Sequence, residues 1–193
     1  MFENLRKYKI VLASNSPRRK ELLGGLGLPF EVRTKQGIDE SYPEGLDGEQ
    51  IALHISRKKA EAYQCDMHER ELIITADTIV YVDGEVLGKP KDSEDARRMF
   101  KLMSGREHQV ITGVCIVTKE KTVQFASRTD VSFAQLTDEE IDYYIENYKP
   151  YDKAGAYGIQ EWIGYVGITG IRGSYFNVVG LPVQRLYIAL KHF

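Results

Sequence analysis

The sequence predicts an α/β fold in which a mixed β-sheet is flanked by helices. Two observations support this class: apolar runs rich in Val and Ile alternate with segments of helical periodicity, and helix-capping residues precede several of those segments. With 193 residues, of which 42% are hydrophobic, the chain is long enough for one sizeable core or two closely joined lobes. No linker, low-complexity tract or internal repeat divides it, so we expect residues 1–193 to form one continuous domain.

The first predicted elements are a strand over residues 10–13 and a helix directly after it. Ser16 fits the N-cap of that helix and Pro17 its first position, while Gly24-Gly25 ends it. A short strand is expected around residues 30–32, where apolar residues alternate.

The middle of the chain predicts a helix followed by a hairpin. Asp47 and Gln50 resemble a capping box that opens a helix to about Tyr63. Residues 72–80 form a β-branched run typical of a strand buried on both faces, and Asp83-Gly84 is a type I′ turn signal after it.

Helix-capping residues, glycines and prolines mark the bounds of the remaining predicted elements. They are a helix capped by Ser93 and ended by Gly105, strands at about 109–118 and 122–133 joined across 119–121, a helix opened by the Thr137–Glu140 capping box and stopped at Pro150, a glycine-rich stretch over 155–180, and a C-terminal helix introduced by Leu181-Pro182.

The composition excludes several classes of protein. Lys and Arg number 26 against 28 Asp and Glu, so no global field attracts nucleic acid or a membrane. Cys65 and Cys115 show no metal or redox spacing and indicate incidental thiols in a reducing compartment. No run has the length of a signal peptide or a bilayer span, so a cytoplasmic location is expected.

Three basic residues in the opening turn of the first helix are the strongest functional feature. Arg18, Arg19 and Lys20 carry the wrong sign for a helix start, which has partial positive charge and unpaired N–H donors. A phosphate or carboxylate bound among them would offset that repulsion. The alternative is an exposed, solvated basic face with no ligand.

Two further charged residues interrupt segments that should be apolar. Lys59 lies on the apolar stripe of its helix and calls for an anionic partner, unless its stem packs while its ammonium reaches water. Asp77 interrupts the buried strand, where an unpaired carboxylate costs several kcal/mol, on the order of the desolvation of one ion. A structural Asp at a strand end is the alternative.

Further candidates lie beyond this strand. Lys89 follows the hairpin, and the glycine-rich loop over residues 152–160 can wrap a small ligand, with Gln160 offering both a donor and an acceptor to a base. A flexible turn is the alternative. The chain has none of the GxxxxGK[ST], GxGxxG, HExxH or GxSxG motifs. Without these motifs, the candidate site residues are the cations Arg18, Arg19, Lys59 and Lys89 and the acids Glu40 and Asp77. Cations that bind phosphates and acids that bind Mg²⁺ are the composition of a phosphoryl-transfer site.

Six motifs in one order give a specific resemblance. They are Ser14-Asn15-Ser16-Pro17-Arg18-Arg19 after an apolar strand, Ile38-Asp39-Glu40, Lys59 in its helix, Ala76-Asp77-Thr78, Gly88-Lys89-Pro90 and the segment from Asp152 to Gln160. Together they resemble the Maf family of nucleotide pyrophosphatases from about residue 10 to residue 190.

The resemblance implies a fold of the inosine-triphosphatase-like type, with two lobes enclosing a cleft, often in a homodimer. It implies hydrolysis of a nucleoside triphosphate to the monophosphate and pyrophosphate with a divalent cation, Mg²⁺ or Mn²⁺. The residue matched by Asp77 is the family's catalytic base, and those matched by Arg19, Thr78 and Gln160 shape substrate choice. The segments around Asp77 and Gln160 look like the dTTP/UTP branch, in contrast to the 7-methyl-GTP branch.

We therefore expect the triphosphate to contact Ser14, Arg18, Arg19, Lys59 and Lys89, and the metal to contact Glu40 and Asp77. The sequence leaves open whether Asp77 acts as base, metal ligand or both. The expected partner is a nucleotide, with no nucleic acid and no membrane. A nucleotide sensor without turnover and a phosphatase that releases orthophosphate are the alternatives.

Overall fold

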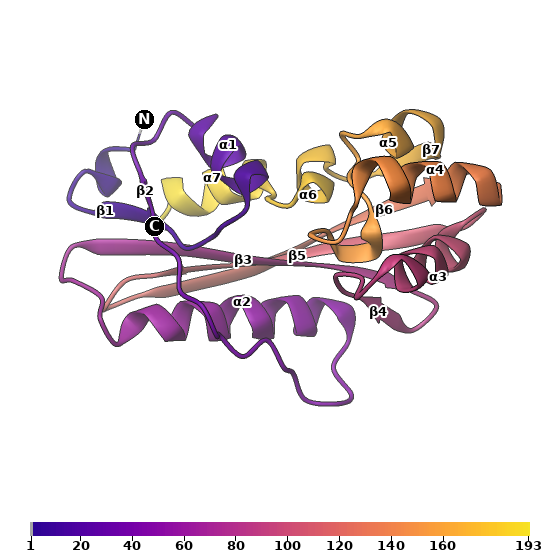
Figure 1. Ribbon diagram of the computed structural model, residues 1–193. Helices are drawn as coiled ribbons and strands as arrows, with labels where there is room; N and C mark the ends of the chain where they lie inside the picture. The colour runs from indigo at the N-terminus through magenta and orange to yellow at the C-terminus, as the bar shows by residue number, and fades with distance from the viewer. Residues whose placement is uncertain (1) are drawn as a thin grey trace. The chain divides into compact units, whose positions relative to one another are not determined.

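A computed structural model describes residues 2–193 and confirms a mixed sheet flanked by helices (Figure 1). The sheet has seven strands. Six of them follow the order β2-β1-β3-β5-β6-β7, and the seventh, β4, pairs with β3. β1 runs parallel to β2 and β3, whereas the β3–β4 and β6–β7 pairs are antiparallel. The strands are β1 Lys9–Leu12, β2 Glu31–Val32, β3 Glu71–Val82, β4 Glu85–Leu87, β5 Glu107–Val117, β6 Thr122–Phe133 and β7 Ile168–Arg172.

Three helices begin where the capping residues predict. Ser16 caps α1, and both predicted capping boxes, Asp47–Gln50 and Thr137–Glu140, are present. Along residues 2–193, no helix has the length and apolar content needed to cross a membrane. The helices are η1 Glu3–Leu5, α1 Pro17–Gly24, α2 Gly48–Gln64, α3 Ser93–Met103, α4 Asp138–Tyr148, η2 Ala154–Ala156, α5 Trp162–Val166, α6 Tyr175–Val179 and α7 Val183–Lys191.

The chain divides into two compact units. The first unit comprises residues 1–77, 112–127 and 180–193, and the second comprises residues 78–111 and 128–179. Three strands, β3, β5 and β6, have residues in both units, so the chain passes between the units within its longest strands.

The core of the first unit has helices on both faces of its strands, as Figure 1 shows for α2 on one side and α1 and α7 on the other. Ile73 packs with Tyr63 of α2, whereas Leu72 packs with Leu23 of α1 and Leu186 of α7. Neighbouring residues of β3 thus bury opposite faces, which explains its continuous apolar run.

Helix α2 lies in close contact with β5 at Gly113. A Cβ at this position would lie 2.2 Å from the carbonyl oxygen of Ala52. The contact involves main-chain atoms on both sides, so neither can move aside by changing a rotamer.

We expect Gly113→Ala to lower the free energy of unfolding by about 2 kcal/mol, the usual range for overpacking a tight core. Urea denaturation followed by circular dichroism measures this change. Gly170→Ala is the matched control, because its Cβ would meet Ser132 only at an ordinary 3.7 Å. Equal stability of the two variants would contradict the assigned helix–strand contact.

The second unit is built around aromatic side chains. The Phe100 ring stacks on Phe133 and meets Tyr144 edge-on, and His108 and Tyr157 pack edge-on against each other and against Phe133. Such edge-to-face pairs add stability beyond the area they bury.

The structure corrects the sequence prediction in two places. The cap of α3 is Asp92, because its carboxylate accepts a hydrogen bond from the Asp95 amide at 2.8 Å, and Ser93 is the first helical residue. The glycine-rich stretch contains α5, β7 and α6, none of which the sequence predicted. The hairpin turn is confirmed, with Asp83 and Gly84 both at positive φ.

Candidate active site

The segment after β1 carries the first site residues. Ser16 accepts a hydrogen bond from the Arg19 amide at 3.3 Å, and the Ser14 hydroxyl accepts one from the Ser16 amide at 3.2 Å. Because β1 runs parallel to β3 and its last residue pairs with Ile74, this segment leaves the sheet at the end where β3 reaches Asp77. Loops at the carboxyl ends of parallel strands are the usual place for ligand sites in α/β folds.

Arg19 folds back onto the main chain beside Asp77. Its Nε donates to the Gly180 carbonyl and its Nη1 to the Ala76 carbonyl, both at 2.8 Å. Burial lowers the pKa of the guanidinium, the Asp77 charge opposes this, and Arg18 lowers the pKa further. Arg19 is therefore part of a built site and not of a solvated face, whereas Lys20 is exposed as that alternative predicts.

Lys59 joins the two acidic residues of the predicted site. Its Nζ lies 2.6 Å from Asp77 Oδ1 and 3.0 Å from Glu40 Oε1. The Lys59 and Asp77 side chains are only 15% and 11% exposed, whereas Glu40 is 52% exposed. The sequence prediction of an inward lysine with an anionic partner is confirmed, and the two carboxylates converge on one point.

The neighbouring lysine holds the same acidic loop, a contact that the sequence analysis missed. Lys58 Nζ lies 2.6 Å from Asp39 Oδ2 and donates to the Ser41 carbonyl at 3.2 Å. The hydrogen bonds from Lys58 and Ser41 hold the pKa of Asp39 well below its usual value. Two consecutive lysines of α2 thus bind two consecutive acids. In the sequence, the matching pairs Lys58-Lys59 and Asp39-Glu40 are the signal that indicates these contacts.

The second unit holds the other three predicted residues. Thr78 directly follows Asp77 in β3, Lys89 is exposed after β4, and Gln160 is exposed at the end of the glycine-rich loop. The Gly155 amide donates to the Gly88 carbonyl at 3.0 Å, so the loops that carry Lys89 and Gln160 are hydrogen-bonded to each other.

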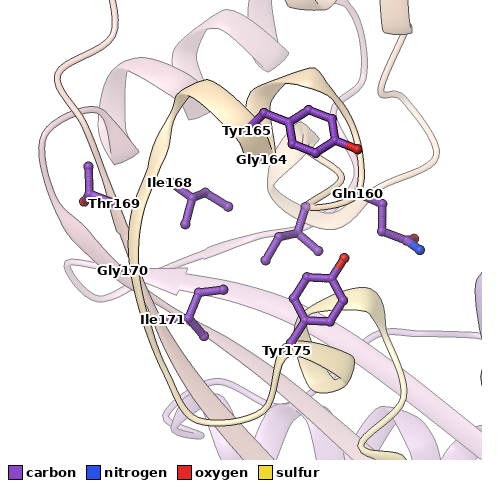
Figure 2. A pocket seen from close by; sticks show the side chains of 9 residues that line it. Gln160, Gly164, Tyr165, Ile168, Thr169, Gly170, Ile171 and Tyr175 are labelled. Atoms are coloured by element: carbon purple, nitrogen blue, oxygen red, sulfur yellow. The ribbon is translucent and has the colours of Figure 1, made fainter.

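Gln160 also lines a pocket of about 440 Å³ within the second unit. Figure 2 shows the rings of Tyr165 and Tyr175 on the same side of this pocket as Gln160, with Ile168 and Ile171 on the other side. Its walls thus combine apolar side chains with polar groups, among them the Gln160 amide and the hydroxyls of the two tyrosines.

Comparison with known proteins agrees with this geometry. A model of the Maf-like protein family matches residues 9–193. A dTTP/UTP pyrophosphatase of Phocaeicola vulgatus is 63% identical over 191 residues, which cover 99% of each chain. A protein of the same name from Parabacteroides distasonis is 61% identical over 193 residues, which cover all of both chains.

Among solved structures, a HAM1 protein from Coxiella burnetii is similar with a TM-score of 0.52. At 12% identity, over 96% of this chain and 100% of that one, the likeness shows the fold alone. It agrees with the inosine-triphosphatase-like fold that the sequence resemblance implies.

The family match contains all six motifs on which the resemblance rests. The motifs of the first unit also meet in space, because Arg19, Glu40, Lys59 and Asp77 form one charged cluster. The sequence motifs, the folded cluster and the end-to-end relatives lead to one conclusion: this chain belongs to the Maf-like protein family.

Proposed function

We propose that this protein hydrolyses dTTP and UTP to the nucleoside monophosphate and pyrophosphate and so removes triphosphates from the nucleotide pool. The observation that carries the proposal is the Lys59 ammonium held between Asp77 and Glu40, next to the guanidinium of Arg19. Relatives that are 61% and 63% identical along their whole length bear the name dTTP/UTP pyrophosphatase.

The cations supply the binding of the triphosphate. Lys59 and Arg19 are held by their protein partners, so little side-chain entropy is lost when a phosphate oxygen arrives. The side chains of Arg18 and Ser14 offer further donors in the same unit. Lys89 stays a phosphate ligand predicted from the sequence.

The two acids fit a divalent cation that shares its coordination with substrate. Among residues 2–193, no group of three or more His, Cys, Asp or Glu side chains is arranged to hold a metal ion. Mg²⁺ in phosphoryl-transfer enzymes is held by one or two carboxylates together with phosphate oxygens and water, and Asp77 with Glu40 match that donor set. When bound, such a cation neutralises developing charge on the phosphate oxygens.

In this proposal Asp77 acts on the attacking water. Its carboxylate is held in position by Lys59 within β3, and in this proposal it orients the water or accepts its proton. In-line attack on the α-phosphorus breaks the bond to the bridging oxygen, and pyrophosphate leaves with its charge opposed by the cations.

The proposal predicts the products and their metal dependence. With Mg²⁺ present, dTTP and UTP are expected to yield the monophosphate and pyrophosphate in equal amounts, measured by ion-exchange chromatography. EDTA should stop pyrophosphate release, and added Mg²⁺ or Mn²⁺ should restore it. Orthophosphate as the released anion would indicate a phosphatase, and tight nucleotide binding without either product would indicate a sensor.

A further inference from the structure

Gln160 lies in a tight turn whose two ends contact one hydroxyl group. The Glu161 amide donates to the Gly158 carbonyl at 3.0 Å, which makes Gly158–Glu161 a four-residue turn with Gln160 at its third position. The Gly158 amide donates to the Tyr144 hydroxyl at 3.0 Å, and that hydroxyl donates to Glu161 Oε2. Tyr144 of α4 therefore holds both ends of the turn.

A buried lysine completes this arrangement. Lys153 Nζ lies 3.0 Å from Glu161 Oε1 and 2.8 Å from Asp152 Oδ1, and Lys153 is only 8% exposed. A buried ion pair contributes little net stability, because desolvation offsets the attraction, but it does fix geometry. We call Tyr144, Lys153, Gly158 and Glu161 the Tyr144 network.

The turn packs closely against two side chains of this network. A Cβ on Gly158 would lie 3.0 Å from both Glu161 Cδ and Lys153 Cε. Burial and the neighbouring Glu161 carboxylate raise the pKa of Tyr144, so its hydroxyl keeps the proton that it donates. Phe100 and Tyr148 pack against the Tyr144 ring and fix its position.

Gln160 itself is exposed, in contrast to the network beneath it. An exposed amide on a mobile turn would present its oxygen or its NH₂ group equally well. Thymine and uracil present an acceptor where cytosine presents an amino donor, so only a held amide distinguishes them.

We propose that Tyr144 is a positioning residue that orients Gln160, through Gly158 and Glu161, for discrimination between pyrimidine bases. This inference rests on the proposed hydrolysis of dTTP and UTP. Tyr144 acts without touching the substrate, because its hydroxyl is occupied by the two ends of the turn.

The test compares kcat/KM for dTTP with kcat/KM for dCTP, which have the same sugar and nearly the same size. Tyr144→Phe removes only the hydroxyl, and we expect the dTTP/dCTP ratio to fall about tenfold, the effect of losing one hydrogen bond between Gln160 and the base. The change should lie in KM for dTTP, with kcat nearly unchanged. Tyr148→Phe, which removes the hydroxyl of the stacked neighbour, is the matched control and should leave the ratio unchanged.

A double variant distinguishes a positioning role of Tyr144 from a general effect on the folded structure. In a Gln160→Ala protein the ratio should already be low, and adding Tyr144→Phe should not lower it further, because residues that act as one unit are not additive. Glu161→Gln, which keeps an acceptor for the Tyr144 hydroxyl, should retain most of the ratio, whereas Glu161→Ala should not.

Three outcomes would overturn the inference: an unchanged ratio in Tyr144→Phe, an equal further loss in the Gln160→Ala background, or no effect of Gln160→Ala. Each of these outcomes compares a variant with a parent protein that hydrolyses dTTP, so none of them contradicts the proposed function. Failure of the parent protein to release pyrophosphate from dTTP or UTP would overturn the proposed function and this inference together. Should Tyr144→Phe not fold, the two Glu161 variants decide the question.

Discussion

Asp77→Asn is expected to lower the rate of pyrophosphate release from dTTP by about 10² to 10⁴-fold, the usual contribution of a positioned general base. The substitution keeps the size of the side chain and removes its charge. It removes the charge that lies 2.6 Å from Lys59 Nζ and leaves the contact of Lys59 with Glu40. A steady-state assay at saturating Mg²⁺ and dTTP measures the effect.

The matched control is Asp130→Asn. Asp130 is also a buried carboxylate held by cations, Arg128 and Arg172, but it lies in the second unit within a β6–β7 pair. We expect its activity to stay within a few-fold of the parent. If Asp77→Asn retains similar activity, the assignment of Asp77 to the reaction is wrong.

The second large effect is a loss of stability in mild acid caused by His108. The ring is 1% exposed, its Nε2 lies 2.8 Å from the Tyr157 hydroxyl, and its Nδ1 has no hydrogen-bond partner among residues 2–193. Burial lowers the pKa of His108 from 6.5 to about 4. The unfolded chain therefore binds a proton between pH 6.5 and 4 that the folded protein excludes.

The direction follows from this difference in bound protons. The contribution of the neutral His108 ring to the free energy of unfolding is fully present well above pH 6.5 and is lost as the pH drops toward 4. At pH 5 we expect the free energy of unfolding to be about 2 kcal/mol lower than at pH 7.5. Carboxylates contribute little in this window. The hydrogen bond from Arg33, for example, lowers the pKa of Glu71 from 4.5 to about 2. The stabilising contribution of this carboxylate is therefore lost only below about pH 4.5.

Urea denaturation of the parent protein and of His108→Gln at pH 7.5 and 5.0 checks the prediction. Glutamine can still bond to Tyr157 but does not titrate, so the variant should lose about 2 kcal/mol less than the parent over the same interval. An identical pH response in both proteins would exclude His108 as the cause.

The sequence marks the charged residues of the cluster around Asp77 but not the way in which they are arranged. Lys59 and Asp77 were recognisable because each is a charge where the periodicity calls for an apolar residue, and the structure pairs them at 2.6 Å. Arg19 was expected among phosphate ligands, and its bonds to the Ala76 and Gly180 carbonyls were not foreseen. Those partners lie 57 and 161 residues away along the chain, beyond the reach of any local pattern.

The same limit explains the elements that were missed. The five-residue β7 includes Gly170, and α5 and α6 are also five residues each, too short for periodicity to detect. The Tyr144 network joins residues from α4 and the following loop by hydrogen bonds, and nothing in local sequence marks a tyrosine whose hydroxyl is buried.

The basic opening turn of α1 shows the division most clearly. The sequence by itself determined the strand, the Ser16 cap and an excess of positive charge at a helix start, because caps and charge act over a few residues. Only the tertiary structure decided what that charge meets: Arg19 binds main-chain carbonyls beside Asp77, and Lys59 binds Asp77 and Glu40. Parallel pairing of β1 with β3 brings the start of α1 to the Ala76 carbonyl, and such pairing depends on the fold of the whole chain.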